Sequence, residues 1–453
     1  MTTATPAPAT IPLLDRHDAS TIVAYRHGRA IGTAEFLDDV ARVAAALPPG
    51  RHVLNTCADR YCFAVGFAAI LVSERISLLP STLTAQTIGQ LKVFAPDAFH
   101  LTDGMSAAID LPAVTYPEGA PFSGAMRAMP EIAPGALAAY VFTSGSTGLP
   151  VPHRKRWGAL ANCVRAEGNI LGLRDGRRHA VLGTVPPQHM YGFESTVLAA
   201  MQNGVAFAAA RPLYPADICG ELSALPRPRV LVTTPFHLRT LLEAEVEVPA
   251  LDLIVSATAP LSPQLARETE HRYGAPLIEI YGSTETGQIA HRRTIEGAEW
   301  RLFPGVRLDV ATEQTWAMGG HLEDRIAMDD VLELVDDDRF LMHGRSADMV
   351  NIAGKRSSIG YLNHQLCAIP GVVDGVFALP DGEPPDGITR LHAAVVAPTL
   401  DHSQLTRALR ERVDPAFMPR RIVFVDKLPR NATGKLPATV LQSLFARRDR
   451  GGH

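Results

Sequence analysis

Four short segments of this 453-residue chain place hydroxyl, glycine and charged side chains where they could bind and activate a polyphosphate. The first covers residues 142–150 and reads FTSGSTGLP, directly after the apolar run 136–141. Glycine lets a backbone approach phosphates closely, and serine and threonine hydroxyls add donors to the main-chain N–H groups. Because no Gly-Lys-Ser/Thr ending follows, the segment predicts a phosphate-binding loop that is not of the Walker A type.

Three further segments follow along the chain. Residues 281–287 read YGSTETG after another apolar run, and residues 344–348 read GRSAD, with Gly354 nine positions beyond Arg345. Residues 429–435 read PRNATGK, close to the C-terminus. Together they supply a carboxylate, a guanidinium and an ammonium group.

In order and spacing, the four segments resemble those of the adenylate-forming superfamily of acyl-CoA and aryl-CoA synthetases, peptide-synthetase adenylation domains and luciferases. The resemblance covers most of the chain, from near Thr33 to Lys435. It implies that ATP converts a carboxylic acid to an acyl-AMP with release of pyrophosphate, and that a thiol then displaces AMP. The chain's size, altered phosphate loop and basic tail look closer to compact bacterial ligases that load aryl or acyl groups onto carrier proteins, as in aryl polyene or xanthomonadin pathways.

The resemblance implies how the reacting phosphates are bound. The residues expected at the β- and γ-phosphates are all in the first segment: Thr143, Ser144, Gly145, Ser146, Thr147 and Gly148. Glu285 is the expected Mg²⁺ ligand, since a hard cation that bridges phosphates prefers carboxylate oxygen. Thr284 is expected to face the α-phosphate or the substrate carboxylate. Lys435 is expected to bridge that carboxylate and the α-phosphate as negative charge develops.

The nucleoside contacts are implied in the same way. Tyr281 is expected to present its ring to the adenine. Asp330 precedes Gly344 by fourteen positions, the separation at which the family carries the aspartate that binds the ribose hydroxyls. Asp329 and Asp324 are rival candidates for this role. Arg345 is expected to add a donor at the ribose.

The chain departs from the family pattern in the phosphate loop. Val151 stands where the family has a lysine. The missing positive charge could come from His153, Arg154 or Lys155, and the sequence leaves this choice open. A second departure is Ala347, at a hinge position where the family often has aspartate.

The acid pocket is read from fewer residues. His189 lies in a segment that resembles the aromatic gate over the acid. Glu194 lies near the place where amino-acid adenylation domains carry an aspartate, but in a poorly matching context, so an amino acid is not favoured. A compact pocket for a benzoate or cinnamate ring is expected from Thr234, Phe236 and residues 257–259. Residues 256–262 resemble the family's segment beside the adenine, with Ala257 and Thr258 in place of its usual glycines.

The favoured acceptor is the phosphopantetheine thiol of an acyl carrier protein, and the alternative is an aryl-CoA or acyl-CoA ligase. From residue 346 onward there are 14 Lys and Arg against 10 Asp and Glu, a basic excess that suits an acidic carrier. Tyr361 and Asn363 replace an acidic pair of the family, which weakens the case for the second half-reaction. An alternative of another class is a nucleotide-binding protein with degenerate catalysis, suggested by Val151 and Ala347.

Composition excludes several classes of protein. With 46% hydrophobic and 20% charged residues, the chain is expected to form a globular protein of more than one domain. A net charge of −4 gives no nucleic-acid signature. Five cysteines without a CxxC pair argue against a disulfide framework or a structural zinc site. No secretory signal is expected at residues 1–10. The apolar run 63–72 is too short for stable membrane insertion and is expected to form a buried helix, so the expected location is cytoplasmic.

The elements that must position these residues are expected to form an α/β fold. A large N-terminal domain, residues 1–344, is expected to hold layered, mostly parallel sheets with helices, and residues 345–453 a small mobile α+β lid that carries Lys435. The three- and four-residue spacing from Thr33 predicts an amphipathic helix that ends at Pro48. Five apolar runs predict strands: residues 52–55, 181–185, 205–209, 230–232 and 253–255. Residues 117–135 are expected to form a surface loop.

Overall fold

The structure, a computed structural model, describes residues 9–105, 108–119, 122, 124, 126–144, 150–244, 246–311, 314–345, 349–352, 355–379, 390–430, 436, 441 and 443–445. Of Ser144, Arg345, Met349, Asn351 and Arg356 it describes the main chain only.

One large sheet carries at its edge the two strands between which the expected phosphate loop lies in the sequence. Its six described strands are ordered β10-β9-β5-β4-β6-β7, and every neighbouring pair is parallel except β9 and β10. The bounds are β4 His52–Asn55, β5 Ile76–Leu79, β6 Phe99–Thr102, β7 Ala113–Thr115, β9 Leu137–Ser144 and β10 Pro150–Arg156. Thr143 pairs with Val151 across the hairpin, and Val141 pairs with His153. Since alternate residues of a strand share a face, Val151, His153 and Lys155 lie on one face of β10.

A second, larger sheet carries the YGSTETG segment. Its eleven described strands are ordered β21-β22-β17-β16-β15-β14-β13-β11-β12-β2-β3. The bounds are β2 Ile22–Arg26, β3 Arg29–Gly32, β11 Ala180–Gly183, β12 Ala206–Ala208, β13 Arg229–Thr233, β14 Leu253–Ser256, β15 Leu277–Ser283, β16 Gly287–Arg292, β17 Trp300–Leu302, β21 Asp330–Leu334 and β22 Arg339–Arg345. The run from β2 to β15 is parallel, whereas β16, β17, β22 and β21 extend it antiparallel.

Smaller sheets complete the described part of the chain. They are β1 Ile11–Pro12 with β8 Glu131–Ile132, β18 Val306–Val310 with β19 Thr315–Gly319 and β20 Leu322–Met328, β23 Met349–Ile352 with β24 Lys355–Ser358, and β25 Asp374–Ala378 with β26 His392–Val396 and β27 Arg421–Phe424. The strand β8 lies inside the segment that was expected to be a surface loop. Its two residues pair with β1 near the start of the described chain, a long-range contact that local composition does not reveal.

The helices cover both faces of the second sheet. Their bounds are α1 Thr33–Ala46, α2 Arg60–Val72, α3 Ala85–Phe94, α4 Trp157–Ile170, α5 Met190–Gly192, α6 Ala199–Asn203, α7 Pro215–Ala224, α8 Pro235–Glu243, α9 Pro263–Tyr273, α10 Ile359–Cys367 and α11 His402–Arg410, with a π-helix η1 Phe193–Leu198 and a 3₁₀-helix η3 Pro415–Phe417. Apolar residues of α7, α8 and α9 pack on one face, and those of α2, α4 and α6 pack on the other. The predicted helices at Thr33 and at residues 63–72 are confirmed as α1 and α2.

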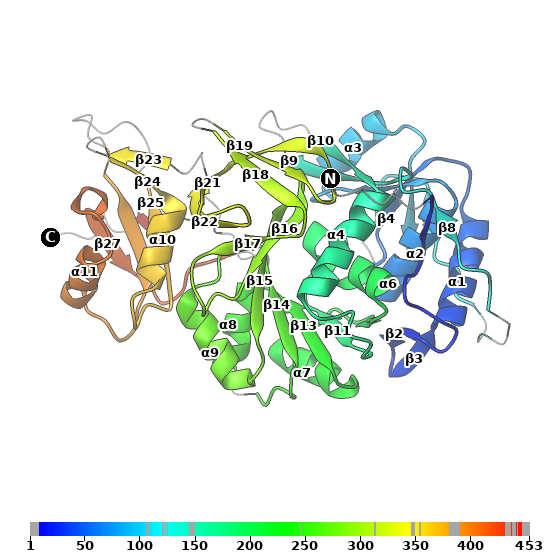
Figure 1. Ribbon diagram of the computed structural model, residues 1–453, viewed down its shortest axis with the longest axis horizontal. Helices are drawn as coiled ribbons and strands as arrows, with labels where there is room; N and C mark the ends of the chain where they lie inside the picture. The colour runs from blue at the N-terminus through cyan, green and yellow to red at the C-terminus, as the bar shows by residue number, and fades with distance from the viewer. Residues whose placement is uncertain are drawn as a thin grey trace.

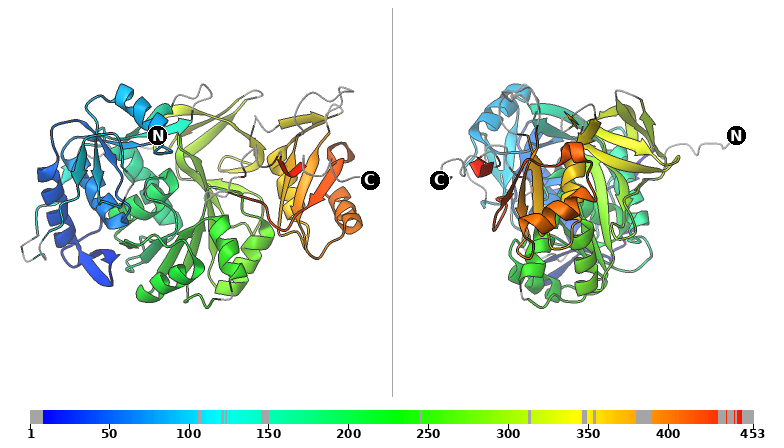
Figure 2. Two further views of the ribbon diagram at one scale, coloured as in Figure 1. Left: turned by 180° about the vertical axis from the view of Figure 1, so that it is seen from behind. Right: turned by 90° about the vertical axis from the view of Figure 1, so that its left-hand side faces the viewer.

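The C-terminal elements form a hydrophobic core of their own. That core contains residues from Val350 to Phe417, drawn from β23, α10, β25, β26 and α11. In Figure 1 these elements, coloured from yellow to orange, lie at the opposite end of the molecule from α1–α3, and the left view of Figure 2 shows the same arrangement from behind. Asp374 of β25 connects the C-terminal elements to helix α8 of the N-terminal part. It accepts hydrogen bonds from Arg430 at 2.8 and 2.9 Å and lies 3.5 Å from Arg239 of α8.

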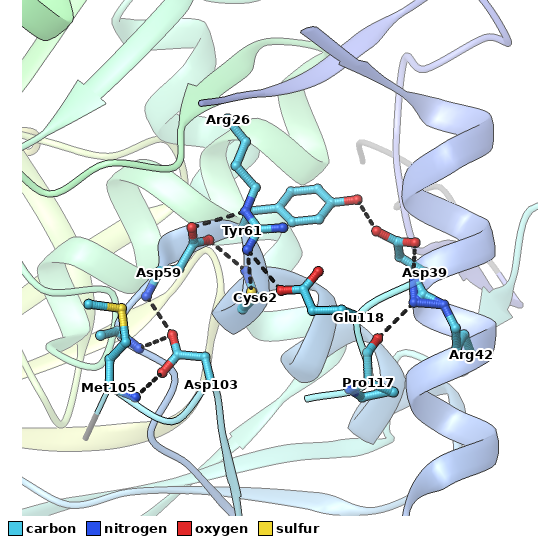
Figure 3. Close-up of polar contacts among 11 residues, drawn as sticks. Arg26, Asp39, Arg42, Asp59, Tyr61, Cys62, Asp103, Met105, Pro117 and Glu118 are labelled. Carbon is cyan, nitrogen blue, oxygen red and sulfur yellow. Dashed lines mark hydrogen bonds and ion pairs between the residues drawn. The ribbon is translucent and has the colours of Figure 1, made fainter. Parts of the chain in front are cut away.

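A polar network fixes the N-terminal end of α2 (Figure 3). Asp59 caps the helix by accepting a hydrogen bond from the Cys62 N–H, and Arg26 of β2 donates to the same carboxylate at 3.0 Å. Asp103 accepts from the main-chain N–H groups of Ala58 and Asp59. The cap therefore joins β2 and the loop after β6 to the buried helix. In the part of the chain that the structure describes, every helix is too short or too polar to cross a membrane.

Candidate active site

The YGSTETG segment covers the end of β15, the turn that follows it and the first residue of β16. Inside the turn, the Ser283 N–H donates to Thr286 Oγ1 at 3.0 Å, and the Thr286 N–H donates back to Ser283 Oγ at 3.1 Å. Gly287 ends the turn at φ 68°, a left-handed conformation that favours glycine. These local hydrogen bonds leave Thr284 and Glu285 at the tip, both half-buried.

The expected Mg²⁺ ligand lies beside the start of the phosphate loop. His153 Nε2 is 2.8 Å from Thr143 Oγ1 and 3.5 Å from Glu285 Oε1, so the imidazole connects β9 to the turn. Burial lowers the pKa of His153, while the Glu285 carboxylate opposes that shift. Side chains from two strands and a turn therefore meet at Thr143, the first of the residues expected to bind the phosphates.

The expected nucleoside residues also meet. The Tyr281 hydroxyl donates to Asp330 Oδ2 at 2.6 Å, and Asp330 is paired with Arg345 across β21 and β22. Of the three aspartates considered for the ribose, Asp330 contacts Tyr281, whereas Asp324 and Asp329 are exposed. A phenol ring and an adjacent carboxylate are suited to stack on a base and to accept hydrogen bonds from a sugar.

His189 lies directly before helix α5, in the segment expected to close over the acid. It is exposed and occupies the N-cap position of α5, directly before the π-helix η1. The Tyr191 hydroxyl donates to the Val255 carbonyl at 3.0 Å, which ties this segment to β14. Since π-helical turns occur often at functional sites, the geometry agrees with a role near the substrate.

Thr258 occupies a position where the family pattern has glycine, and it keeps the glycine conformation. Its φ is 77°, which is an outlier for a β-branched residue. Its Oγ1 is buried and has no hydrogen-bond partner within the described residues. The sequence revealed the replacement of the glycine but not the left-handed backbone. Strained residues of this kind cluster at ligand sites.

Sequence reasoning missed a buried cluster behind the turn. We call it the inner polar cluster, and it consists of Lys155, Cys163, Glu167, Glu194, Ser195, Gln288 and His321. Ser195 Oγ donates to Glu167 Oε1 at 2.6 Å and accepts from Gln288 Nε2 at 2.8 Å. Burial raises the pKa of Glu167 to about 7, and it also raises the pKa of Glu194, a shift that the Lys155 ammonium opposes. Glu194 therefore lies inside the protein, 3.6 Å from the Cys163 thiol. The signal in the sequence that could have revealed this cluster was the run of charged residues on β10, a strand that also packs against the core.

Several expected site residues lie outside the described residues. They are Gly145, Ser146, Thr147, Gly148 and Lys435. Ala347 and Gly354 lie outside as well, and the side chains of Ser144 and Arg345 are not described. Their roles stay predictions.

Comparison with known proteins identifies relatives along most of the chain. A family model described as AMP-binding enzyme matches residues 50–317. A 4-coumarate–CoA ligase of Cereibacter sphaeroides is 30% identical over 308 residues, which cover 67% of this chain and 71% of that protein. A 3-hydroxybenzoate–CoA/4-hydroxybenzoate–CoA ligase of Thauera aromatica is 27% identical over 360 residues, which cover 70% of this chain and 68% of that protein.

Solved structures agree with the architecture. ATP-bound MatB from Rhodopseudomonas palustris has a TM-score of 0.77 at 19% identity and covers 94% of this chain and 96% of its own. The anthranilate CoA ligase AuaEII in complex with anthranoyl-AMP has a TM-score of 0.78 at 16% identity, with 96% and 98% covered. The expected α/β fold, with a large N-terminal part of mostly parallel sheets and a small C-terminal part, is confirmed.

Proposed function

Because this chain belongs to the AMP-binding enzyme family, we propose that it uses ATP to activate an aromatic carboxylic acid and transfers the acyl group to a thiol. In the first step a carboxylate oxygen attacks the α-phosphorus and pyrophosphate leaves. In the second step a thiol sulfur attacks the acyl carbon and AMP leaves. The aromatic substrate is supported by the named acids of the relatives, which are coumarate and hydroxybenzoate.

One observation carries this proposal: two groups of expected site residues each come together in the structure. Thr143, His153 and Glu285 meet at the start of the phosphate loop. Tyr281 contacts Asp330, and both of these residues lie in the second sheet. The first group suits a triphosphate and the second a nucleoside. Adenylation depends on positioning and on stabilising charge at the α-phosphate, and both need residues from several elements held in one place. For Lys435, we propose the contact with the α-phosphate that the family resemblance implies.

A single carboxylate beside the phosphates fits Mg²⁺. Within the described residues, no group of three or more His, Cys, Asp and Glu could hold a metal ion by itself. Mg²⁺ usually keeps several waters and binds one or two carboxylates together with substrate phosphates. Glu285 would hold it here, and the ion would neutralise charge on the departing pyrophosphate. The half-buried carboxylate of Glu285 needs no other protein ligand for that role.

For the missing phosphate-loop lysine, we propose His153 as the replacement. Arg154 is exposed and lies on the other face of β10, and Lys155 is buried with its ammonium bonded to a carbonyl. His153 shares the face of Val151 and already contacts Thr143. We expect His153→Ala to raise the KM for ATP about tenfold, the effect of one lost hydrogen bond to a charged group. Arg154→Ala is the control, and equal KM values in the two variants would exclude His153.

Two acceptors are supported by different observations. Free coenzyme A is supported by the names of the relatives, which are CoA ligases. An acyl carrier protein is supported by exposed arginines near α11: Arg407, Arg410, Arg412 and Arg420. A thioester assay that offers coenzyme A and a phosphopantetheinylated carrier protein to the same acyl adenylate decides between them. Added salt should slow the carrier reaction more, because charge steers that encounter.

The two halves of this reaction would use the two regions of the chain. We propose a domain boundary at Arg345, with residues 1–344 binding ATP and the acid and residues 345–453 forming the lid. The separate hydrophobic core of the C-terminal elements supports this division. A boundary at this place allows the lid to rotate between the two half-reactions.

Pyrophosphate release tests the proposal. We would measure it with Mg²⁺ and ATP across hydroxybenzoates, cinnamates, fatty acids and amino acids. We expect strong release with an aromatic acid and loss of that release in Lys435→Ala. Absence of pyrophosphate release with every acid would instead favour a nucleotide-binding protein with degenerate catalysis.

A further inference from the structure

Lys155 is a buried cation directly beneath the YGSTETG turn. It lies on β10 with 7% of its surface exposed, and its Nζ donates to the main-chain carbonyl of Glu285 at 2.9 Å. A buried ammonium is costly unless it is paired and hydrogen-bonded. The carbonyl bond joins two residues 130 positions apart, so it ties the phosphate-loop hairpin to the turn.

Acidic groups surround the ammonium on several sides. The Glu194 carboxylate of η1 favours the charged form of Lys155 most, and the carboxylates of Glu285 and Glu323 favour it as well. Burial lowers the pKa of Lys155, and Glu194 opposes that shift. The Cys163 Sγ lies 3.6 Å from Glu194 Oε1, so the carboxylate is also contacted from α4.

The inner polar cluster contacts three successive residues of the turn. Lys155 bonds the carbonyl of Glu285, and the His321 Nε2–H donates to the carbonyl of Thr286 at 3.0 Å. Burial lowers the pKa of His321 to about 4, so the ring is neutral and its one N–H proton is on Nε2. A Cβ at Gly287 would lie 2.8 Å from Glu194 Oε1, so the carboxylate packs directly against that backbone.

We propose that Lys155 is a positioning residue for adenylation, which fixes the main chain of Glu285 so that the Thr284 hydroxyl and the Glu285 carboxylate point toward the triphosphate. The Glu194 carboxylate compensates the charge of the Lys155 ammonium. The inference rests on the proposed function, because the turn is assigned to ATP there. A main-chain bond at the metal-ligand residue controls where the adjacent side chains lie, and a displacement of about 1 Å can cost about 100-fold in rate.

Three variants separate positioning from charge compensation. Lys155→Met keeps most of the length of the side chain but removes the carbonyl bond and leaves Glu194 without its cation. The double variant Lys155→Met/Glu194→Gln removes the bond and also the unpaired charge. Lys92→Met is the matched control, because Lys92 forms only a surface ion pair with Asp110 among its described contacts.

We expect Lys155→Met to lower kcat for pyrophosphate release about 100-fold, while the KM for the acid stays unchanged. The double variant should regain thermal stability but not kcat. Full recovery of kcat in the double variant would overturn the proposal, since charge compensation would then be the whole role of Lys155. If Lys155→Met fails to fold, the double variant alone gives the decision by the same criterion.

A binding measurement keeps this test separate from the proposed function. The probe is an α,β-methylene analogue of ATP, titrated calorimetrically with and without Mg²⁺. We expect Lys155→Met to bind it more weakly than the unchanged chain only when Mg²⁺ is present. Equal affinities with Mg²⁺ would overturn the inference, whereas absence of pyrophosphate release in the unchanged chain would count against the proposed function alone.

Discussion

Gly287→Ala perturbs the turn and the inner polar cluster at their contact. The added Cβ would meet Glu194 Oε1 at 2.8 Å, and Cys163 Sγ and His321 Nε2 at 3.6 Å. Glu194 is buried and cannot move into solvent. The left-handed φ of 68° adds a cost of about 1–2 kcal/mol for alanine, and overpacking typically adds about 1–3 kcal/mol. We therefore expect a loss of about 2–5 kcal/mol in the free energy of unfolding.

The assay is thermal unfolding, with Gly89→Ala as the matched control. Gly89 lies in α3, where a Cβ would meet nothing within 4 Å, so alanine there should stabilise the helix by about 0.5–1 kcal/mol. The two identical substitutions should thus shift the melting temperature in opposite directions. Glu194→Asp, which shortens the carboxylate side chain by one methylene, should recover part of the loss in Gly287→Ala. If Gly287→Ala melted like the unchanged chain, the packing described for Glu194 would be wrong.

Two further predictions concern the nucleoside contact and the buried carboxyl groups. Tyr281→Phe keeps the ring but removes the 2.6 Å hydrogen bond to Asp330, so we expect the KM for ATP to rise about tenfold with no change in the KM for the acid; an unchanged KM for ATP would show that this hydrogen bond does not support ATP binding. The pKa of Glu167 is raised by burial from its ordinary value near 4.5 to about 7, so the folded state binds the extra proton and the resulting stability is lost as pH rises through 7. Glu167→Gln should therefore flatten the fall in melting temperature between pH 5 and 8, and parallel curves for the two proteins would refute the assignment.

The sequence predicted those parts of the site that depend on local patterns. The YGSTETG segment was expected after a strand, and Tyr281, Thr284 and Glu285 lie at the end of β15 and in its turn. Asp330 was found by its spacing from Gly344, and it contacts Tyr281. Helices α1 and α2 were readable because their apolar residues follow helical spacing or form one continuous run.

Long-range packing explains what could not be predicted. Lys155 was one of three charges near the missing lysine, and its burial and its hydrogen bond to the main-chain carbonyl of Glu285, 130 positions away, distinguish it from His153. Glu194 was weighed as a substrate contact, and its place in the inner polar cluster depends on the packing of η1. Thr258 was seen as a replaced glycine, and its left-handed backbone depends on the packing around the turn after β14. Composition and period contain no information on these distances.

The central claim is that this chain forms an acyl adenylate. The most direct measurement is mass spectrometry of the enzyme-bound product after incubation with ATP, Mg²⁺ and either 4-hydroxybenzoate or 4-coumarate. The account predicts an aryl-AMP in the unchanged chain and its absence in Lys435→Ala. An unchanged chain that binds ATP but forms no adenylate with any acid of the panel would contradict it.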